Sequence, residues 1–230
     1  MPPFARRLLL LVALLLPSAA GLVATNARAA GDPVIAAAGD IACAAQQKTT
    51  PGQCRQAETA KLIESLKPAA VLALGDEQYP CGSAADFATS FGKTWGKLKA
   101  KLHPVPGNHE YNVGAPGKSA TSRVGSDCAT TPSPSDAAGY YGYFGAAATP
   151  LDPSCRAGCG GWYSFDIGAW HIIGLNSNCE AVSCTAGSAQ ETWLKADLAA
   201  HPNACTLAMW HHPRFSPGIS GNNSGMATLW

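Results

Sequence analysis

Charged residues are scarce in this sequence, and the basic ones form no cluster. Lysine and arginine number 16, aspartate and glutamate number 15, and charged residues make up 13% of the chain. A protein that binds nucleic acid carries a patch or stripe of basic residues. We therefore expect no nucleic-acid-binding patch.

Long apolar runs are also missing after residue 30. No run there reaches the length of about 18 residues that a membrane-spanning helix needs. The chain has no internal repeat and no linker-like stretch. We expect a single domain over residues 31–230, which is long enough for a sizeable hydrophobic core.

The first 30 residues contain no acidic residue and have the order of a targeting segment. Arg6-Arg7 precede nine apolar residues, Leu8 to Leu16, and Ala27-Arg28-Ala29 offers a cleavage site with small residues. This pattern predicts a signal peptide over residues 1–30, with an N-terminal membrane anchor as the alternative. We expect a secreted or extracytoplasmic protein of the cell envelope, without a stable membrane anchor after cleavage.

Nine cysteines in an exported chain predict disulfide bonds. Close spacing favours three pairs and leaves two cysteines for each other, while Cys205 is expected to be a buried thiol in a strand. Zinc ligation by the closely spaced cysteines is the alternative. The expected pairs are Cys43–Cys54, Cys155–Cys159, Cys179–Cys184 and Cys81–Cys128.

Short apolar runs alternate with helical patterns in the first half of the domain. Strands are expected at residues 34–38, 69–74 and 103–105, and helices at 55–66 and 85–102. The expected apolar face of the first helix holds Leu62, Ile63 and Leu66, and that of the second holds Phe87, Phe91, Trp95 and Leu98. This βαβαβ order predicts an α/β fold with a parallel sheet. A long loop at 111–136 is expected to border a site or to be a mobile surface loop, and the aromatic residues at 137–144 are expected to be core.

The pattern in the second half of the sequence predicts a β-hairpin, a helix and a further strand. Residues 162–166 and 170–175 flank a short turn that contains glycine. Ser188-x-x-Glu191 is a capping box for a helix that runs to about residue 200. Residues 205–210 are expected to be a buried strand, and a helical turn is expected near the end.

Side chains that can bind metal follow four of these strands. In open α/β sheets, ligands bind beyond the carboxyl ends of the strands. Mixed oxygen and nitrogen donors favour iron, manganese or zinc over calcium. A carboxylate at a strand end can bridge two ions about 3.5–4 Å apart. The candidate residues are Asp40, Asp76, Tyr79, Asn108, His109, His211 and His212.

Four motifs contain these residues, in the order Gly39-Asp40, Gly75-Asp76-x-x-Tyr79, Gly107-Asn108-His109-Glu110 and Trp210-His211-His212-Pro213. This order resembles the calcineurin-like metallophosphoesterase superfamily, and most closely purple acid phosphatases and their bacterial exported relatives. The resemblance implies a four-layer α/β/β/α sandwich and a binuclear-metal phosphoesterase. Its substrates would be small-molecule phosphate monoesters, as for an acid phosphatase.

The resemblance also implies a role for each residue. Asp40 and Tyr79 would bind the first ion, which is ferric in purple acid phosphatases, and Asp76 would bridge both ions. Asn108 and His211 would bind the second ion, which would be iron, zinc or manganese. A metal-activated hydroxide would attack phosphorus. His109 would contact the phosphate and assist the leaving group, His212 would face the phosphate, and Glu110 would be structural.

Two departures from the family pattern are visible. Many members have a histidine two residues after the first aspartate, where this chain has Ala42, and the presence of Tyr79 instead favours the purple-phosphatase branch. The family closes its site with a Gly-His-x-His stretch that supplies one ligand to each ion, and this sequence has none. We expect the C-terminal part of the domain to be missing from the sequence, and the printed chain to bind metal poorly.

Three alternatives remain open from the sequence. A phosphodiesterase or nucleotidase of the same superfamily would use the same motifs. A non-catalytic exported binding protein could keep the fold. The protein could also be a surface module that is held together by disulfides and binds no metal.

Overall fold

The computed structural model describes residues 33–111, 136–202, 205–218 and 221–230. The chain divides into Met1–Gly31 and Asp32–Trp230, and the described residues belong to the second unit. The expected signal peptide, Cys128 and almost all of the expected loop at 111–136 lie outside the described residues. No helix in the described ranges is long and apolar enough to cross a membrane.

The first half of the described chain forms a parallel three-stranded sheet in the order β1-β2-β3. β1 pairs with β2 through Ala36 opposite Val71, and β2 pairs with β3 through Val71 opposite Leu102. The predicted parallel βαβαβ arrangement is confirmed. The elements are β1 (Ile35–Ala38), α1 (Gln56–Leu66), β2 (Ala70–Ala73) and β3 (Leu102–Pro104).

The prediction of a single helix at 85–102 is wrong in detail. The segment changes helical type three times, and the passage from the wide π-turn to α3 falls at Gly92. A Cβ atom at Gly92 would lie 2.8 Å from the carbonyl oxygen of Phe87. The expected apolar face is nevertheless buried, through Phe87, Phe91, Trp95 and Leu98. The consecutive elements are α2 (Ala84–Asp86), η1 (Phe87–Phe91), α3 (Gly92–Thr94) and η2 (Trp95–Lys101).

A second three-stranded sheet has the order β4-β5-β6. β4 and β5 are antiparallel around a turn at Gly168, as the sequence predicted, and β6 runs parallel to β5. Ser188 Oγ accepts a hydrogen bond from the Glu191 N–H at 3.2 Å, which confirms the helix start. The elements are β4 (Tyr163–Ile167), β5 (Trp170–Gly174), α5 (Ala189–Ala200), β6 (Cys205–Met209) and η5 (Ser224–Thr228).

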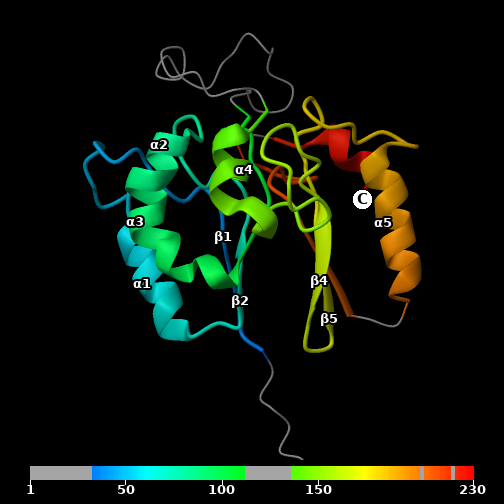
Figure 1. Cartoon of the computed structure of the whole chain (residues 1–230), viewed down its shortest axis with the longest axis horizontal. Helices are drawn as coiled ribbons and strands as arrows, with labels where there is room; N and C mark the ends of the chain where they lie inside the picture. The colour runs from blue at the N-terminus through cyan, green and yellow to red at the C-terminus, as the bar shows by residue number, and fades with distance from the viewer. Residues whose placement is uncertain (1–32, 112–135, 203–204, 219–220) are drawn as a thin grey trace, which may run out of the picture. The chain divides into compact units, whose positions relative to one another are not determined.

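Helices cover the outer faces of the two sheets, so the described residues form α/β/β/α layers (Figure 1). In β2, Val71 packs in the cluster under the helices while Leu72 packs in the cluster between the sheets. In β5, Ile172 packs between the sheets and Ile173 packs towards α5. Since neighbouring side chains on a strand point to opposite faces, each sheet contributes to two cores.

Aromatic residues fill the core beneath the first sheet's helices. Tyr140, Tyr141 and Phe144 are buried, which confirms the prediction that this aromatic segment is core. Phe144 packs edge-on against Phe87 and Phe91. The elements that carry these residues are α4 (Ala138–Phe144) and η4 (Gly145–Ala147).

Two predictions of burial are wrong. Cys205 is exposed, because β6 is an edge strand among the described residues and turns most of its side chains to solvent. On α1, Leu62 and Leu66 are exposed, whereas Ala60 and Ile63 face the core. The pattern of apolar residues on α1 therefore placed the buried face about a quarter turn away from its actual position.

Three expected disulfides are present in the described residues, namely Cys43–Cys54, Cys155–Cys159 and Cys179–Cys184. Zinc ligation by these cysteines is therefore wrong. Cys81 is also disulfide-bonded, and its expected partner lies outside the described residues.

Candidate metal centre

The candidate residues lie at neighbouring strand ends. Asp40 follows β1, Asp76 follows β2 and Asn108 follows β3. These strands are parallel, so their carboxyl ends share one edge of the sheet. His211 follows β6 in the other sheet, and its Nδ1 donates to the Leu74 carbonyl oxygen at 2.9 Å. This contact brings the ends of the two sheets together.

Two glycines leave space for the side chains of Asp76 and His211. Asp76 adopts a left-handed backbone conformation with φ of 51°. A Cβ atom at Gly107 would overlap the Asp76 carboxylate and backbone nitrogen, and one at Gly75 would lie 2.6 Å from His211 Nδ1. The glycines of two motifs are therefore required by the close approach of Asp76 and His211.

The buried Asp76 carboxylate is the common contact of three other candidate residues. Tyr79 Oη donates to Asp76 Oδ2 at 2.9 Å and also donates to Asp40 Oδ1. His211 Nε2 lies 3.4 Å from Asp76 Oδ2, and His109 Nε2 lies 3.7 Å from the same oxygen. The His109 backbone N–H donates to Asp76 Oδ1 at 3.0 Å. Residues far apart in sequence thus meet around one carboxylate.

Asp76 and His211 form a buried ion pair. Burial opposes ionisation of Asp76, but the hydrogen bond and charge of His211 outweigh it and hold the Asp76 pKa at about 2. Burial likewise opposes protonation of His211, and the Asp76 carboxylate raises the His211 pKa to about 9. Burial and the two nearby carboxylates raise the Tyr79 pKa well above its usual value. Tyr79 is therefore a neutral phenol whose single O–H proton is shared between the two carboxylates.

Asn108 Oδ1 lies between two imidazole rings. It is 3.2 Å from His211 Nε2 and 3.2 Å from His212 Nε2. Nδ1 of His212 contacts Ser177, as Nδ1 of His211 contacts Leu74. Burial, followed by the charge of His211, lowers the His212 pKa to about 4, so His212 is neutral. An amide oxygen and two Nε2 atoms therefore point to the same place.

His109 presents one ring nitrogen to the centre. Its Nδ1 donates to the Pro80 carbonyl oxygen at 2.6 Å, which leaves Nε2 on the side of Asp76. The ring lies edge-on to Tyr79, with 4.2 Å between ring centroids. The side chain is 16% exposed. Nε2 is therefore oriented for contact with a molecule in the centre.

Glu110 holds the loops of the centre in place. Its fully buried carboxylate accepts hydrogen bonds from the backbone N–H groups of Asp76, Gly107 and Gln78 at 2.9, 2.8 and 3.2 Å. Burial and the nearby Asp76 raise the Glu110 pKa to about 7. These contacts agree with the structural role expected for Glu110.

Sequence reasoning missed the contribution of the loop after β5. Ser177 Oγ accepts a hydrogen bond from the His212 N–H at 2.9 Å. Asn178 Nδ2 donates to the Pro106 carbonyl oxygen at 3.0 Å, which links the two sheets near the centre. The signal that could have found them is a run of three polar residues directly after a buried strand.

A cavity of about 620 Å³ opens beside Asp40 and Tyr79. Part of its wall is the Cys43–Cys54 disulfide. Such a cavity has the size of a small-molecule site. Other lining residues are Gln47, Arg55, Thr59 and Trp95.

The donor set fits two hard or borderline metal ions. It combines carboxylate, phenol and amide oxygens with an imidazole nitrogen, the mixture that suits iron, manganese and zinc. Asp76 lies between the Tyr79–Asp40 side and the His211–Asn108 side of the cluster.

Comparison with known protein families places residues 33–228 of the chain in one of them. The model of the family described as calcineurin-like phosphoesterase matches residues 33–228. No individual curated protein matches significantly. The matched range includes every residue of the centre described above.

Proposed function

The chain belongs to the calcineurin-like phosphoesterase family, and on that basis we propose that it is an exported two-metal hydrolase of phosphate monoesters. Family membership indicates a metal-dependent phosphoesterase. The observation that supports two ions is the position of Asp76, whose carboxylate is shared by donors from both sheets.

Each side of Asp76 would hold one ion. Asp40 and Tyr79 would bind the first, Asn108 and His211 the second, and Asp76 would contact both. Iron would occupy the first position, with iron, zinc or manganese in the second. Two such ions supply Lewis acidity towards phosphoryl oxygens and a nucleophilic water near neutral pH.

His109 would assist departure of the alcohol. Its Nδ1 donates to the Pro80 carbonyl oxygen, so the imidazolium form would carry its second proton on Nε2, give it to the leaving oxygen and become neutral. His212 would contact a phosphate oxygen from the other side of Asn108. The organic part of the ester would lie in the cavity beside Asp40 and Tyr79.

Export is supported by the disulfides. Disulfides persist in oxidising compartments and are rare in the cytosol. Three bonded pairs within the described residues suit a secreted or cell-envelope protein.

The deciding experiment is a hydrolysis assay on the full-length protein supplied with iron, manganese or zinc. We expect metal-dependent hydrolysis of a chromogenic phosphate monoester, faster than that of the matching diester, and loss of activity in Asp76→Asn. A faster diester reaction would replace the monoesterase by a phosphodiesterase. Metal binding without hydrolysis would favour a binding protein, and no metal binding at all would overturn the proposal.

A further inference from the structure

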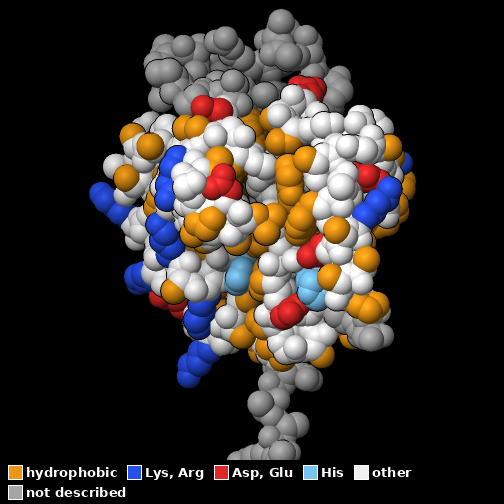
Figure 2. Space-filling view, turned by 45° about the vertical axis from the view of Figure 1, so that its right-hand side comes forward, with side chains coloured by type: hydrophobic (Ala, Val, Ile, Leu, Met, Phe, Trp, Pro, Cys, Tyr) orange, Lys and Arg blue, Asp and Glu red, His pale blue; other side chains and the backbone are white. Residues whose placement is uncertain are grey.

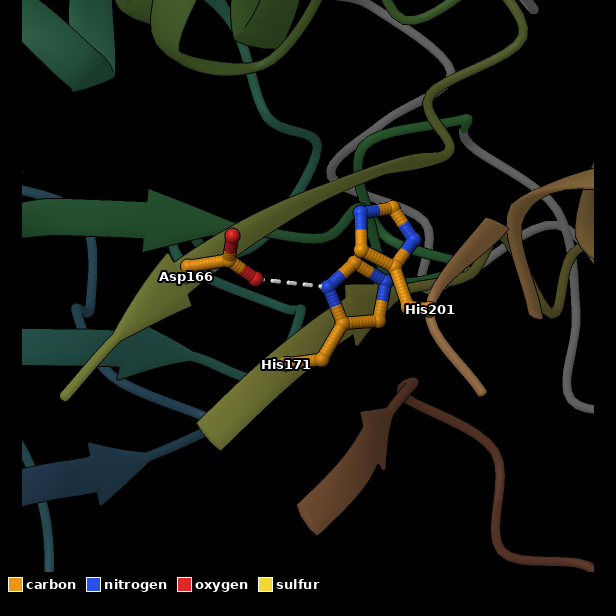
Figure 3. Close-up of side chains that lie close together, drawn as sticks. All are labelled: Asp166, His171 and His201. Carbon is orange, nitrogen blue, oxygen red and sulfur yellow. Dashed lines mark hydrogen bonds and ion pairs between the residues drawn. The ribbon is translucent and has the colours of Figure 1, made fainter. Parts of the chain in front are cut away.

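A second group of metal-capable side chains lies at the other end of β5. Asp166 comes from β4, His171 from β5 and His201 from the residue that ends α5 (Figure 3). One ligand atom of each lies within 4.8 Å of the other two. The candidate metal centre is at the opposite end of β5, where Ser177 follows the strand.

His171 is oriented by two carboxylates. Its Nδ1 lies 2.7 Å from Asp166 Oδ1, its cross-strand partner, and its Nε2 lies 2.8 Å from Asp197 Oδ2. Asp197 also accepts a hydrogen bond from Ser164 Oγ at 2.7 Å. Metal-binding histidines commonly donate their second ring N–H to a carboxylate. Asp197 fills that place, which leaves Nδ1 of His171 as the metal-binding atom.

His201 contacts the same aspartate through its backbone. Its Nδ1 donates to the Asp197 backbone carbonyl oxygen at 2.8 Å, so Nε2 is the nitrogen available to an ion. Its ring stacks on His171, with 3.8 Å between ring centroids. A single residue, Asp197, therefore orients both imidazole rings, one through its side chain and the other through its backbone.

The group is buried on one side and open on the other. His171 is 1% exposed, whereas the side chains of Asp166 and His201 are 67% and 35% exposed. Both border an open cavity of about 360 Å³. Histidine and acidic side chains lie close together on this face of the surface (Figure 2). An ion can reach the group from solvent and keep a water as a further ligand.

We propose that Asp166, His171 and His201 bind one zinc ion, at a site separate from the phosphoesterase centre. Two imidazole nitrogens and one carboxylate oxygen are a donor set that zinc uses with a fourth, open position. Ligand atoms about 2.0–2.2 Å from zinc lie roughly 3.3–3.6 Å apart in a tetrahedron. Asp166 Oδ1 is now closer than this to His171 Nδ1, at 2.7 Å, and the His201 ring is stacked on the His171 ring. Binding would therefore rotate the two exposed side chains, so that Asp166 moves away from Nδ1 and the His201 ring turns its Nε2 towards the ion.

The expected consequence is structural. The ion would join the β4–β5 hairpin, through Asp166 and His171, to the end of α5, through His201. An ion that binds only the folded chain stabilises it by mass action. Zinc at this site would therefore raise the melting temperature of the protein.

The test uses the full chain with Asp76→Asn and His211→Gln, which removes binding at the phosphoesterase centre. Zinc titration by calorimetry should give one ion per chain in this background. Adding His201→Gln or Asp166→Asn should weaken zinc binding by about 10-fold or more, since each removes a ligand from an exposed position. His103→Gln is the matched control, because His103 stacks on Phe165 and lies outside the group.

A second measurement reports on the location of the ion. Trp170 lines the same cavity and is 42% exposed, so Cu²⁺ as a probe should quench its fluorescence. Trp170→Phe should remove that part of the quenching, and His201→Gln should weaken it. Equal zinc affinity in the background and in its His201→Gln and Asp166→Asn derivatives would overturn the proposal, as would a folded background chain that binds no zinc.

Discussion

Glu110 and Asp76 are joined by a hydrogen bond of 2.9 Å, in which the buried Glu110 carboxylate accepts the backbone N–H of Asp76. The same carboxylate also accepts the N–H groups of Gly107 and Gln78. The loop after β3 therefore positions the loop after β2.

Removal of this carboxylate should destabilise the protein. Glu110→Ala leaves three backbone donors without their partner, and each buried unsatisfied group costs about 1–3 kcal/mol. We expect a loss of about 3 kcal/mol or more in the free energy of unfolding by urea. Glu180→Ala, at an exposed position, should change stability little. Equal stability of the two variants would contradict the role of Glu110.

His109→Ala should lower kcat for a phosphate monoester by about 100-fold or more if His109 is the general acid. An alkyl phosphate should lose more activity than a nitrophenyl phosphate, because a nitrophenolate departs without protonation. Steady-state kinetics on both esters measures the difference, with His103→Gln as the control. An unchanged kcat on both esters would remove His109 from the mechanism.

The colour of the protein tests whether the first ion is ferric iron bound to Tyr79. A ferric ion bound to the Tyr79 phenolate should give the protein a pink or purple colour, and Tyr79→Phe should abolish the visible absorption band. Tyr143→Phe, at a half-buried tyrosine away from the centre, should keep it. A colourless chain with full activity would instead indicate manganese or zinc.

Gly107→Ala should damage the centre without removing any donor. The added Cβ atom would overlap the Asp76 carboxylate, and such overpacking costs about 1–3 kcal/mol. We expect lower stability and weaker metal binding, measured by thermal melting and by dialysis against metal. Gly52→Ala is the matched control, since nothing lies within 4 Å of its added Cβ atom. Similar behaviour of both variants would show that Gly107 is not required for space.

The N-terminus of α5 gives a prediction on stability alone. Ser188→Ala removes the oxygen that caps the helix and should cost about 1 kcal/mol. The rate of ester hydrolysis should stay unchanged, because the cap lies outside the centre. Ser183→Ala, at an exposed loop position, serves as the comparison. A large loss of activity in Ser188→Ala would show that α5 is coupled to the centre.

The candidate centre could be predicted because its signals are local. Most donors come within a few residues of the end of a short apolar run, as Asp76 follows β2. Parallel pairing then brings such strand ends together. The glycines next to Asp76 and Asn108 were part of the same short motifs. The sequence does not say how far each side chain reaches, so the hydrogen bonds of Ser177 and Asn178 were missed.

The zinc-binding group could not be predicted, because its parts carry no local signal. His171 and His201 are 30 residues apart in the sequence, and neither lies in a motif. They meet only because α5 packs on the second sheet and ends beside the β4–β5 turn. The prediction that Cys205 is buried was wrong for a similar reason. An apolar run in the sequence does not show whether its strand will lie at the edge of a sheet.

Strand β5 has a candidate metal site at each end. From His171 to Ser177, an extended chain covers roughly 20 Å at about 3.3 Å per residue. The two sites share no residue and draw on different loops, one after β2 and β3 and the other at the β4–β5 turn. We therefore expect that substitutions at the turn can change the stability of the protein while leaving the arrangement of side chains around Asp76 as it is.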